Sequence, residues 1–250
     1  MSPLEVAAIL AAGVAAGTVN TIVGSGSLIT FPTLLAFGYA PLVANVSNTV
    51  GLFPGTISGS VGYRRELGGQ LPRVLVLGIA ALVGSLCGGI LLLALPPTAF
   101  ERVVPYLILL ACGMVALQGR LSEAVARRKA RPGHQLALLT LGVFATGIYA
   151  GYFGAAQGVI LIALLGILLT DELQRLNALK NVLTAAASGI AALLFIVAGP
   201  VAWPPALLLA GGAVLGGQIG AALGRRMHPG LLRWAVVVVG LVVAIRLLTA

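Results

Sequence analysis

The chain has 250 residues, of which 59% are hydrophobic and only 8% are charged, and its mean hydropathy is +1.09. Soluble globular domains carry about one-quarter charged residues, so this composition excludes a soluble enzyme. Stretches without any charged residue span 6–63, 74–100, 103–119, 135–170 and 181–224. Since about 20 apolar residues suffice for one membrane-spanning helix, the sequence predicts an all-α, polytopic membrane protein.

The net charge of +9 does not require a nucleic-acid partner. Most of the 15 Lys and Arg residues fall in short stretches between apolar runs, where positive charge orients helices in the lipid bilayer. We therefore expect the bilayer and no nucleic acid as a partner. A homo-oligomer is one assembly that the sequence allows.

The sequence offers no metal or cofactor site. Cys87 and Cys112 lie inside apolar runs, with neither a CxxC neighbour nor a nearby His. The stretch from Met1 to Glu5 lacks the basic region of a cleaved signal, so we expect the first apolar run to stay in the mature protein.

Proline and glycine breaks, together with the charges, divide the chain into two groups of five apolar segments. The first group lies at about 4–23, 27–38, 42–62, 74–95 and 100–118, and the second at about 136–153, 158–169, 174–198, 203–223 and 230–248. The sequence thus predicts a first transmembrane repeat at 1–118, a basic cytoplasmic connector at 119–134 and a second transmembrane repeat at 135–250. The second segment of each group, with about 12 residues, is too short to span a core about 30 Å thick as a straight helix. These two segments are predicted to be broken or re-entrant, which leaves 8–10 transmembrane segments.

The basic residues predict the orientation. Alternation across ten segments places three arginine-bearing stretches on one face, which the positive-inside rule makes cytoplasmic. They contain Arg64, Arg65 and Arg73; Arg120, Arg127, Arg128, Lys129 and Arg131; and Arg225, Arg226 and Arg233. Both termini then lie outside. If the short segments do not cross, eight spanning helices and two hairpins result instead, and the termini would change side.

Five segments in each group would start the second group from the opposite side of the membrane, so a duplication would give two inverted repeats. Glycine spacing supports a duplication at an offset of about 130 residues. Gly13, Gly17, Gly24 and Gly38 precede Asn45–Asn48, whereas Gly142, Gly147, Gly154 and Gly166 precede Asn177–Asn181. Chance alignment is the alternative, because glycine is common in membrane helices.

Short, glycine-interrupted segments at corresponding places of two halves are typical of transporters that bind substrate near the midplane. Asn20 and the run Gly24-Ser25-Gly26-Ser27 precede the first short segment, and Gly151 to Gly158, with Gln157, precede the second. Backbone N–H groups exposed at such helix starts can hold an oxyanion. Close helix packing is the alternative role of these glycines, and it is the role we expect for Gly212, Gly216, Gly220 and Gly224.

Polar side chains enter the membrane in the segment after each short one. At helical spacing Asn45 and Asn48 share one face, as do Asn177, Lys180, Asn181 and Thr184. Lys180 is the most informative, because an intramembrane charge indicates a functional site and no Asp or Glu lies within the apolar runs. A substrate anion would neutralise it. The alternatives are that Lys180 snorkels to the cytoplasmic interface or pairs with Asp171 or Glu172.

Missing motifs exclude several activities. The sequence has no phosphate-binding Walker loop, and His134 and His228 both fall in predicted cytoplasmic stretches, which argues against an intramembrane serine protease. All six acidic residues lie at segment ends or between segments, so a buried carboxylate relay and a metal-ion pathway are not expected. We therefore expect no enzyme.

Five stretches, in this order along the chain, form a pattern shared with a known family. They are Gly17-Thr-Val-Asn20, Gly24-Ser-Gly-Ser-Leu-Ile-Thr-Phe-Pro32, Ala44-Asn45-Val-Ser-Asn48-Thr49, Gly59 to Arg65 and Asn177-Ala-Leu-Lys180-Asn181-Val-Leu. Over nearly the whole chain the sequence resembles the sulfite exporter TauE/SafE family, also called the probable membrane transporter family. The resemblance implies a multi-pass permease of the bacterial or archaeal inner membrane, with two related halves, that moves sulfite, sulfonates or other small sulfur-containing anions.

The residues and the resemblance together favour a secondary transporter of small anions that works by alternating access between two inverted halves. The residues expected to bind substrate are Asn20, Ser25, Ser27, Asn48, Gln157, Asn177, Lys180 and Asn181. An anion channel and a non-transporting membrane assembly protein are the two alternatives. Neither the direction of transport nor the coupling ion follows from the sequence.

Overall fold

A computed structural model describes residues 1–126, 135–224 and 230–249 of the chain. Within these ranges all regular secondary structure is helical, as predicted. The helices are α1 (Pro3–Ile22), α2 (Ser27–Ala36), α3 (Pro41–Gly62), the 3₁₀ turn η1 (Arg64–Leu67), α4 (Leu71–Ala94), α5 (Pro97–Ala126), α6 (Gln135–Tyr152), α7 (Gln157–Leu168), α8 (Leu173–Ala198), α9 (Trp203–Leu223) and α10 (Gly230–Thr249). Several residues with predicted cytoplasmic positions lie outside the described residues, namely Arg127, Arg128, Lys129, Arg131, His134, Arg225, Arg226 and His228.

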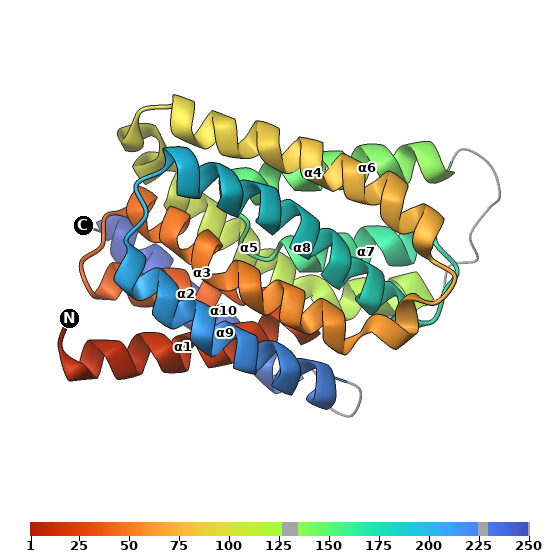
Figure 1. Ribbon diagram of the computed structural model, residues 1–250, viewed down its shortest axis with the longest axis horizontal. Helices are drawn as coiled ribbons and strands as arrows, with labels where there is room; N and C mark the ends of the chain where they lie inside the picture. The colour runs from red at the N-terminus through yellow and green to blue at the C-terminus, as the bar shows by residue number, and fades with distance from the viewer. Residues whose placement is uncertain (127–134, 225–229, 250) are drawn as a thin grey trace.

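Five of the described helices are long and apolar enough to cross a membrane. They are Pro3–Ile22, Leu71–Ala94, Pro97–Gln118, Leu173–Ala198 and Trp203–Leu223. Helix α3 has a spanning length but carries Asn45, Ser47 and Asn48 in its first half, which lowers its hydropathy. The protein is therefore a multi-pass membrane protein, and both chain ends lie at the same end of the helical bundle (Figure 1).

Two short helices, α2 with 10 residues and α7 with 12, occupy the positions where the sequence predicted broken segments. Helices of this length rise only about 15–18 Å. Each follows a sharp break with left-handed backbone, at Gly24 (φ +88°) and at Gly154 (φ +75°). The first break lies beside the last turns of α1, since a Cβ added to Gly26 would overlap the carbonyl group of Ala16. Helix α2 then returns to the start of α1, where Tyr39 Oη donates a hydrogen bond to Glu5 Oε1 at 3.2 Å.

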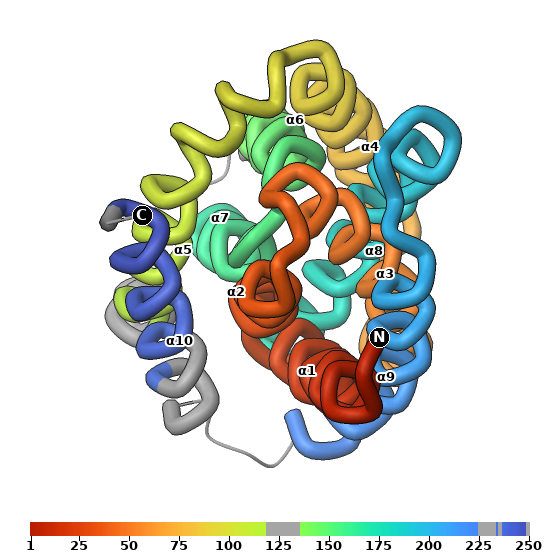
Figure 2. Tube along the Cα trace, turned by 90° about the vertical axis from the view of Figure 1, so that its left-hand side faces the viewer, coloured from red at the N-terminus to blue at the C-terminus, as the bar shows by residue number. Residues whose placement is uncertain are grey.

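The two short helices lie in the middle of the bundle (Figure 2). On one side, α2 packs against α10 and α7 against α5, and α5 and α10 pack against each other. On the other side, α1 and α3 pack against α9, and α6 and α8 pack against α4. This arrangement surrounds both helix breaks with other helices.

Glycines let the long helices approach closely, as expected from their spacing. In α9, Gly212 and Gly216 lie against the backbone of α1 at Leu10 and Val14. In α4, Gly88 lies in the same way against Ile148 of α6. Gly220 lies in the same way against Thr18 of α1, so the predicted packing role of the α9 glycines is confirmed for Gly212, Gly216 and Gly220.

Two elements differ from the sequence prediction. Helix α5 continues to Ala126, eight residues past its predicted end at 118 and into the predicted connector. The added stretch contains Arg, Leu, Glu and Ala, which all favour helix. Its Arg and Glu make it too polar to be predicted as part of a membrane span. The turn η1 was not predicted, because its sequence, Arg64 to Leu67, has no apolar period.

Candidate functional site

The two helix breaks meet at the centre of the molecule. The backbone N–H of Gly158, at the start of α7, donates a hydrogen bond to the carbonyl oxygen of Gly24, just before α2, at 3.1 Å. No side chain fits between them, because a Cβ at Gly158 would lie 2.5 Å from Gly24 Cα. The glycines at these positions thus join the starts of two short helices that are about 130 residues apart in the sequence.

Neither α2 nor α7 has a side chain that caps its N-terminus. The first N–H groups of α7, those of Gln157, Gly158 and Val159, bond backbone carbonyls of the two breaks and of Ala156. What the helix starts offer a ligand is therefore the partial positive charge of the helix dipole. Two such helix starts side by side favour a negatively charged ligand near them.

A small, largely enclosed cavity of about 20 Å³ lies at the two breaks. Residues of α1, α2, α3, α6, α7, α8 and the second break line it: Asn20, Ser27, Thr49, Leu52, Thr56, Ala150, Phe153, Gly154, Gln157 and Ser188. Thr49 and Thr56 lie near the middle of α3, and Ser188 lies near the middle of α8. The cavity is therefore near half depth in the bundle, and its volume suits about one water molecule.

The polar groups around the cavity are neutral. Gln157 Nε2 donates a hydrogen bond to Ser188 Oγ at 3.3 Å, and Thr56 Oγ1 donates to the carbonyl of Phe53 at 2.7 Å. On the apolar side, the Phe153 ring meets the Phe31 ring edge to face, with centroids 5.5 Å apart. Hydroxyls, amides and helix starts can coordinate a small anion without a charged side chain in direct contact.

Three of the eight residues predicted to bind substrate line this cavity: Asn20, Ser27 and Gln157. The other five are Ser25, Asn48, Asn177, Lys180 and Asn181, which are buried but do not line it. Ser25 is buried in the first break, and its hydroxyl makes no hydrogen bond to the described protein. Asn48 accepts a hydrogen bond from Thr30 of α2.

Seven residues of the cavity wall were not among those predicted to bind substrate, namely Thr49, Leu52, Thr56, Ala150, Phe153, Gly154 and Ser188. The sequence did contain a signal for the hydroxyl residues Thr56 and Ser188. Thr56 and Ser188 lie one or two turns beyond the polar residues that the sequence singled out, at helical spacing from Thr49 and from Asn181. Extending each polar face by two turns would have included them.

The Lys180 side chain is only 1% exposed, which excludes snorkelling to the interface. Its Nζ donates hydrogen bonds to the carbonyl oxygens of Thr21, at 3.0 Å, and Asn20, at 3.4 Å. The alternative of an acidic partner is also excluded within the described residues, because no carboxylate lies within salt-bridge distance of Lys180 and Asp171 pairs with two arginines. Lys180 thus binds the C-terminal end of α1, directly behind the cavity-lining Asn20.

Side chains from α3 and α8 bind the last turns of the helices that precede the breaks. Asn181 Nδ2 donates a hydrogen bond to the carbonyl of Thr21 in α1 at 3.3 Å. Asn45 Nδ2 donates to the carbonyl of Tyr152 in α6 at 3.1 Å. The intramembrane polar faces predicted from the sequence therefore hold the ends of α1 and α6 in place.

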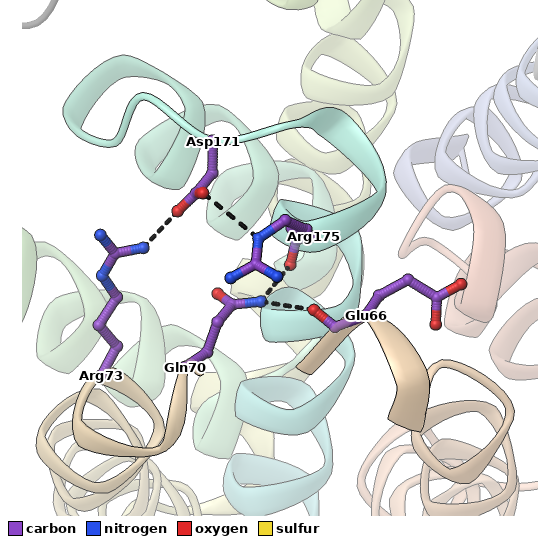
Figure 3. Close-up of polar contacts among 5 residues, drawn as sticks. All are labelled: Glu66, Gln70, Arg73, Asp171 and Arg175. Atoms are coloured by element: carbon purple, nitrogen blue, oxygen red, sulfur yellow. Dashed lines mark hydrogen bonds and ion pairs between the residues drawn. The ribbon is translucent and has the colours of Figure 1, made fainter. Parts of the chain in front are cut away.

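A polar cluster joins the start of α4 to the connection between α7 and α8 (Figure 3). Arg73 forms a salt bridge with Asp171, and Arg175 Nε contacts the same carboxylate at 3.4 Å. Gln70 Nε2 donates hydrogen bonds to the backbone carbonyls of Glu66, at 2.9 Å, and Arg175, at 3.2 Å. This cluster lies at the end of the molecule that the arginine distribution predicts to be cytoplasmic.

Residues 9–247 match the family described as "Sulfite exporter TauE/SafE". The chain is 28% identical to "Probable membrane transporter protein YfcA" of Escherichia coli strain K12, over 99% of this chain and 91% of that protein. It is 29% identical to a "Probable membrane transporter protein" of Haemophilus influenzae, over 90% of this chain and 88% of that protein. No solved structure matches the chain significantly.

Proposed function

Because this chain belongs to the sulfite exporter TauE/SafE family and is thus a membrane transporter, we propose that it carries small anions as a secondary transporter of the cell inner membrane. Sulfite, sulfonates and related sulfur-containing oxyanions are the proposed substrates. The family description supports the sulfur-containing group, and the positive dipole ends of α2 and α7, which meet at the cavity, support an anion.

The proposed mechanism is alternating access between two inverted halves, α1–α5 and α6–α10. The pattern of helix contacts supports it, because a shift of five helices converts each main contact into another one. The pair α1 and α9 corresponds to α6 and α4, the pair α3 and α9 to α8 and α4, and the pair α2 and α10 to α7 and α5. The pairs α3 and α8, and α5 and α10, correspond to themselves. Rocking of one such half against the other around a central site is how many secondary transporters work.

The observation that carries the proposal is the largely enclosed polar cavity between the two helix breaks. A transporter that alternates passes through a state in which its site is closed to both sides, whereas a conducting channel needs a continuous path. With room for about one water molecule, the cavity is smaller than a sulfur oxyanion. Substrate entry therefore requires the halves to move apart at one end.

We assign roles to the eight predicted residues from their positions. Asn20, Ser27 and Gln157 contact the anion from the cavity wall, and Ser25 offers its unpaired hydroxyl from the first break. Lys180 and Asn181 act through the end of α1, and Asn48 and Asn177 maintain the polar interior of α3 and α8.

The test is uptake of labelled sulfite and of a small labelled sulfonate into proteoliposomes. We expect saturable uptake that is stimulated by substrate on the opposite side. Gln157→Ala should lower uptake at least tenfold, because it removes an amide of the cavity wall that bonds Ser188. Gln218→Ala is the matched control, because that amide bonds Ser58 between α9 and α3, away from the cavity.

The two alternative functions give other results in the same assay. Flux that does not saturate and shows no stimulation by substrate on the opposite side would indicate an anion channel. No flux of either solute, with or without a proton gradient, would favour a non-transporting membrane assembly protein.

A further inference from the structure

The C-terminal end of α1 forms a cation site inside the protein. The carbonyl oxygens of Asn20 and Thr21 point to one place, where they accept hydrogen bonds from Lys180 Nζ at 3.4 and 3.0 Å. Asn181 Nδ2 donates to the same Thr21 oxygen at 3.3 Å. Among the residues whose burial is described, Lys180 is the only buried one with a charged side chain.

The surroundings of the ammonium group explain how its charge is tolerated. The last carbonyls of a helix have no partner within the helix and carry about half a negative charge together. In α1 these carbonyls face the protein interior because the helix stops at the Gly24 break. Two of the three N–H donors of Lys180 satisfy them. The lysine and the helix end thus neutralise each other in part.

In many secondary transporters, carbonyls at the C-terminal ends of broken helices coordinate the coupling cation, commonly Na⁺. The end of α1 has this character, and it lies directly behind Asn20 of the cavity wall. In this protein, however, a covalently attached ammonium group fills the place of a dissolved ion.

We propose that Lys180 is a tethered cation that occupies a coupling-cation site at the end of α1, so that transport does not require sodium. This inference rests on the proposed transport function and specifies its ion requirement. Removal of the side chain would leave an oxygen-lined site for a free cation. Besides the two carbonyls, that site would have the amide oxygen of Asn181 within reach after a flip, because the amide nitrogen of Asn181 already bonds the Thr21 carbonyl.

The other helix break has no such cation. There the carbonyl of Tyr152, at the end of α6, accepts a hydrogen bond from the neutral amide of Asn45. Asn48 stands at the place in α3 that matches Lys180 in α8, and it bonds Thr30 instead. The tethered charge therefore belongs to one break alone among the described residues.

The first experiment measures uptake into proteoliposomes in sodium chloride and in choline chloride. Wild-type uptake should be equal in the two salts. Lys180→Ala should reduce uptake in choline at least tenfold, and Na⁺ or ethylammonium should restore it at least threefold. Leu179→Ala is the control, because it removes a neighbouring buried side chain that belongs to a core cluster of α4, α6, α7 and α8, and its uptake should not respond to either cation. Wild-type uptake that requires Na⁺ would overturn the proposal.

The second experiment measures thermal unfolding in detergent and does not depend on transport. The melting temperature of Lys180→Ala in choline should lie below that of the wild type, and Na⁺ or ethylammonium should raise it in a concentration-dependent way. If Lys180→Ala does not fold, Lys180→Gln, whose side chain is one atom shorter and carries no charge, takes its place. A melting temperature that responds to neither cation would overturn the tethered-cation site. Absence of wild-type flux would overturn the transport function alone.

Discussion

The hydroxyl of Thr56 illustrates how a single cavity residue can be tested. It lines the cavity, is only 6% exposed and donates its hydrogen to the carbonyl of Phe53 in its own helix. Its oxygen still has lone pairs, and its hydrogen can turn toward a bound oxyanion. Loss of one such hydrogen bond costs about 1 kcal/mol, or about a fivefold change in affinity. We expect Thr56→Val to raise the KM for substrate about fivefold in the uptake assay.

Thr146 provides the matched control for this substitution. It is equally buried, at 6% exposed, and its hydroxyl bonds the carbonyl of Gly142 at 2.7 Å, but it does not line the cavity. Thr146→Val should therefore leave the KM unchanged. Equal KM values for Thr56→Val and Thr146→Val would show that the cavity does not bind the substrate.

Gly24 tests the contact between the two breaks. Its left-handed backbone disfavours any other residue by about 1–2 kcal/mol, and a Cβ would in addition overlap the backbone of Gly158. Gly38 has nearly the same backbone, with φ +85°, but open space around its Cα. Gly38→Ala should thus cost only the backbone term, whereas Gly24→Ala should lower the melting temperature further and abolish uptake. A Gly24→Ala protein that melts and transports like Gly38→Ala would contradict the close approach of the two breaks.

Some residues of the site could be predicted from the sequence, whereas the partners of Lys180 could not. Asn20, Ser27 and Gln157 were predictable because glycines mark the breaks next to them. The partners of Lys180 were not predictable, because they are backbone carbonyls of Asn20 and Thr21, and any residue types at those positions would supply the same oxygens.

Two neighbouring glycines of α9, Gly211 and Gly212, should respond in opposite ways to substitution by alanine. A Cβ at Gly212 would overlap the backbone of α1 at Leu10, whereas Gly211 has open space on the other side of the same turn. Alanine favours helix over glycine by about 1 kcal/mol. Gly211→Ala should therefore keep or raise the melting temperature in detergent, while Gly212→Ala should lower it by pushing α9 away from α1. Similar melting temperatures for the two variants would argue against close packing of these helices.

Helix positions were well predicted because proline, glycine and charge mark most of their ends. The short helix α7 was predicted at 158–169 and is found at Gln157–Leu168. The end of α5 was not predicted, because helix formation and membrane insertion have different requirements there. The residues after 118 are too polar for a predicted membrane span, but they continue the helix to Ala126.

The sequence could suggest two related halves but not the contacts between their helices. A glycine offset of about 130 residues indicates which segments correspond. It does not indicate that α1 packs on α9 rather than on α6, since apolar helix faces in lipid are alike in composition. Side chains at close approach decide that pairing, and those are known only in three dimensions.

The salt bridge between Arg73 and Asp171 connects the two proposed halves at the predicted cytoplasmic end (Figure 3). Arg73 belongs to α4 in the first half, and Asp171 precedes α8 in the second. If the halves separate there to open the cavity, this bridge must break. Partly exposed pairs contribute about 0.2–1 kcal/mol, so its removal should increase the population open at that end up to about fivefold.

The substitution Ser27→Cys places a thiol in the cavity wall, where a reagent can reach it only when the cavity opens. The native cysteines are removed by the substitutions Cys87→Ser and Cys112→Ala. In inside-out vesicles, Asp171→Asn should raise the rate at which a membrane-impermeant thiol reagent labels Ser27→Cys about two- to fivefold. Glu172→Gln is the matched control, because it neutralises the adjacent, exposed carboxylate, for which no salt bridge is described. The charge exchange Arg73→Asp with Asp171→Arg should return labelling toward the original rate. Equal labelling of Asp171→Asn and Glu172→Gln would mean that the bridge does not hold the cavity closed and that opening at this end is controlled by helix packing alone.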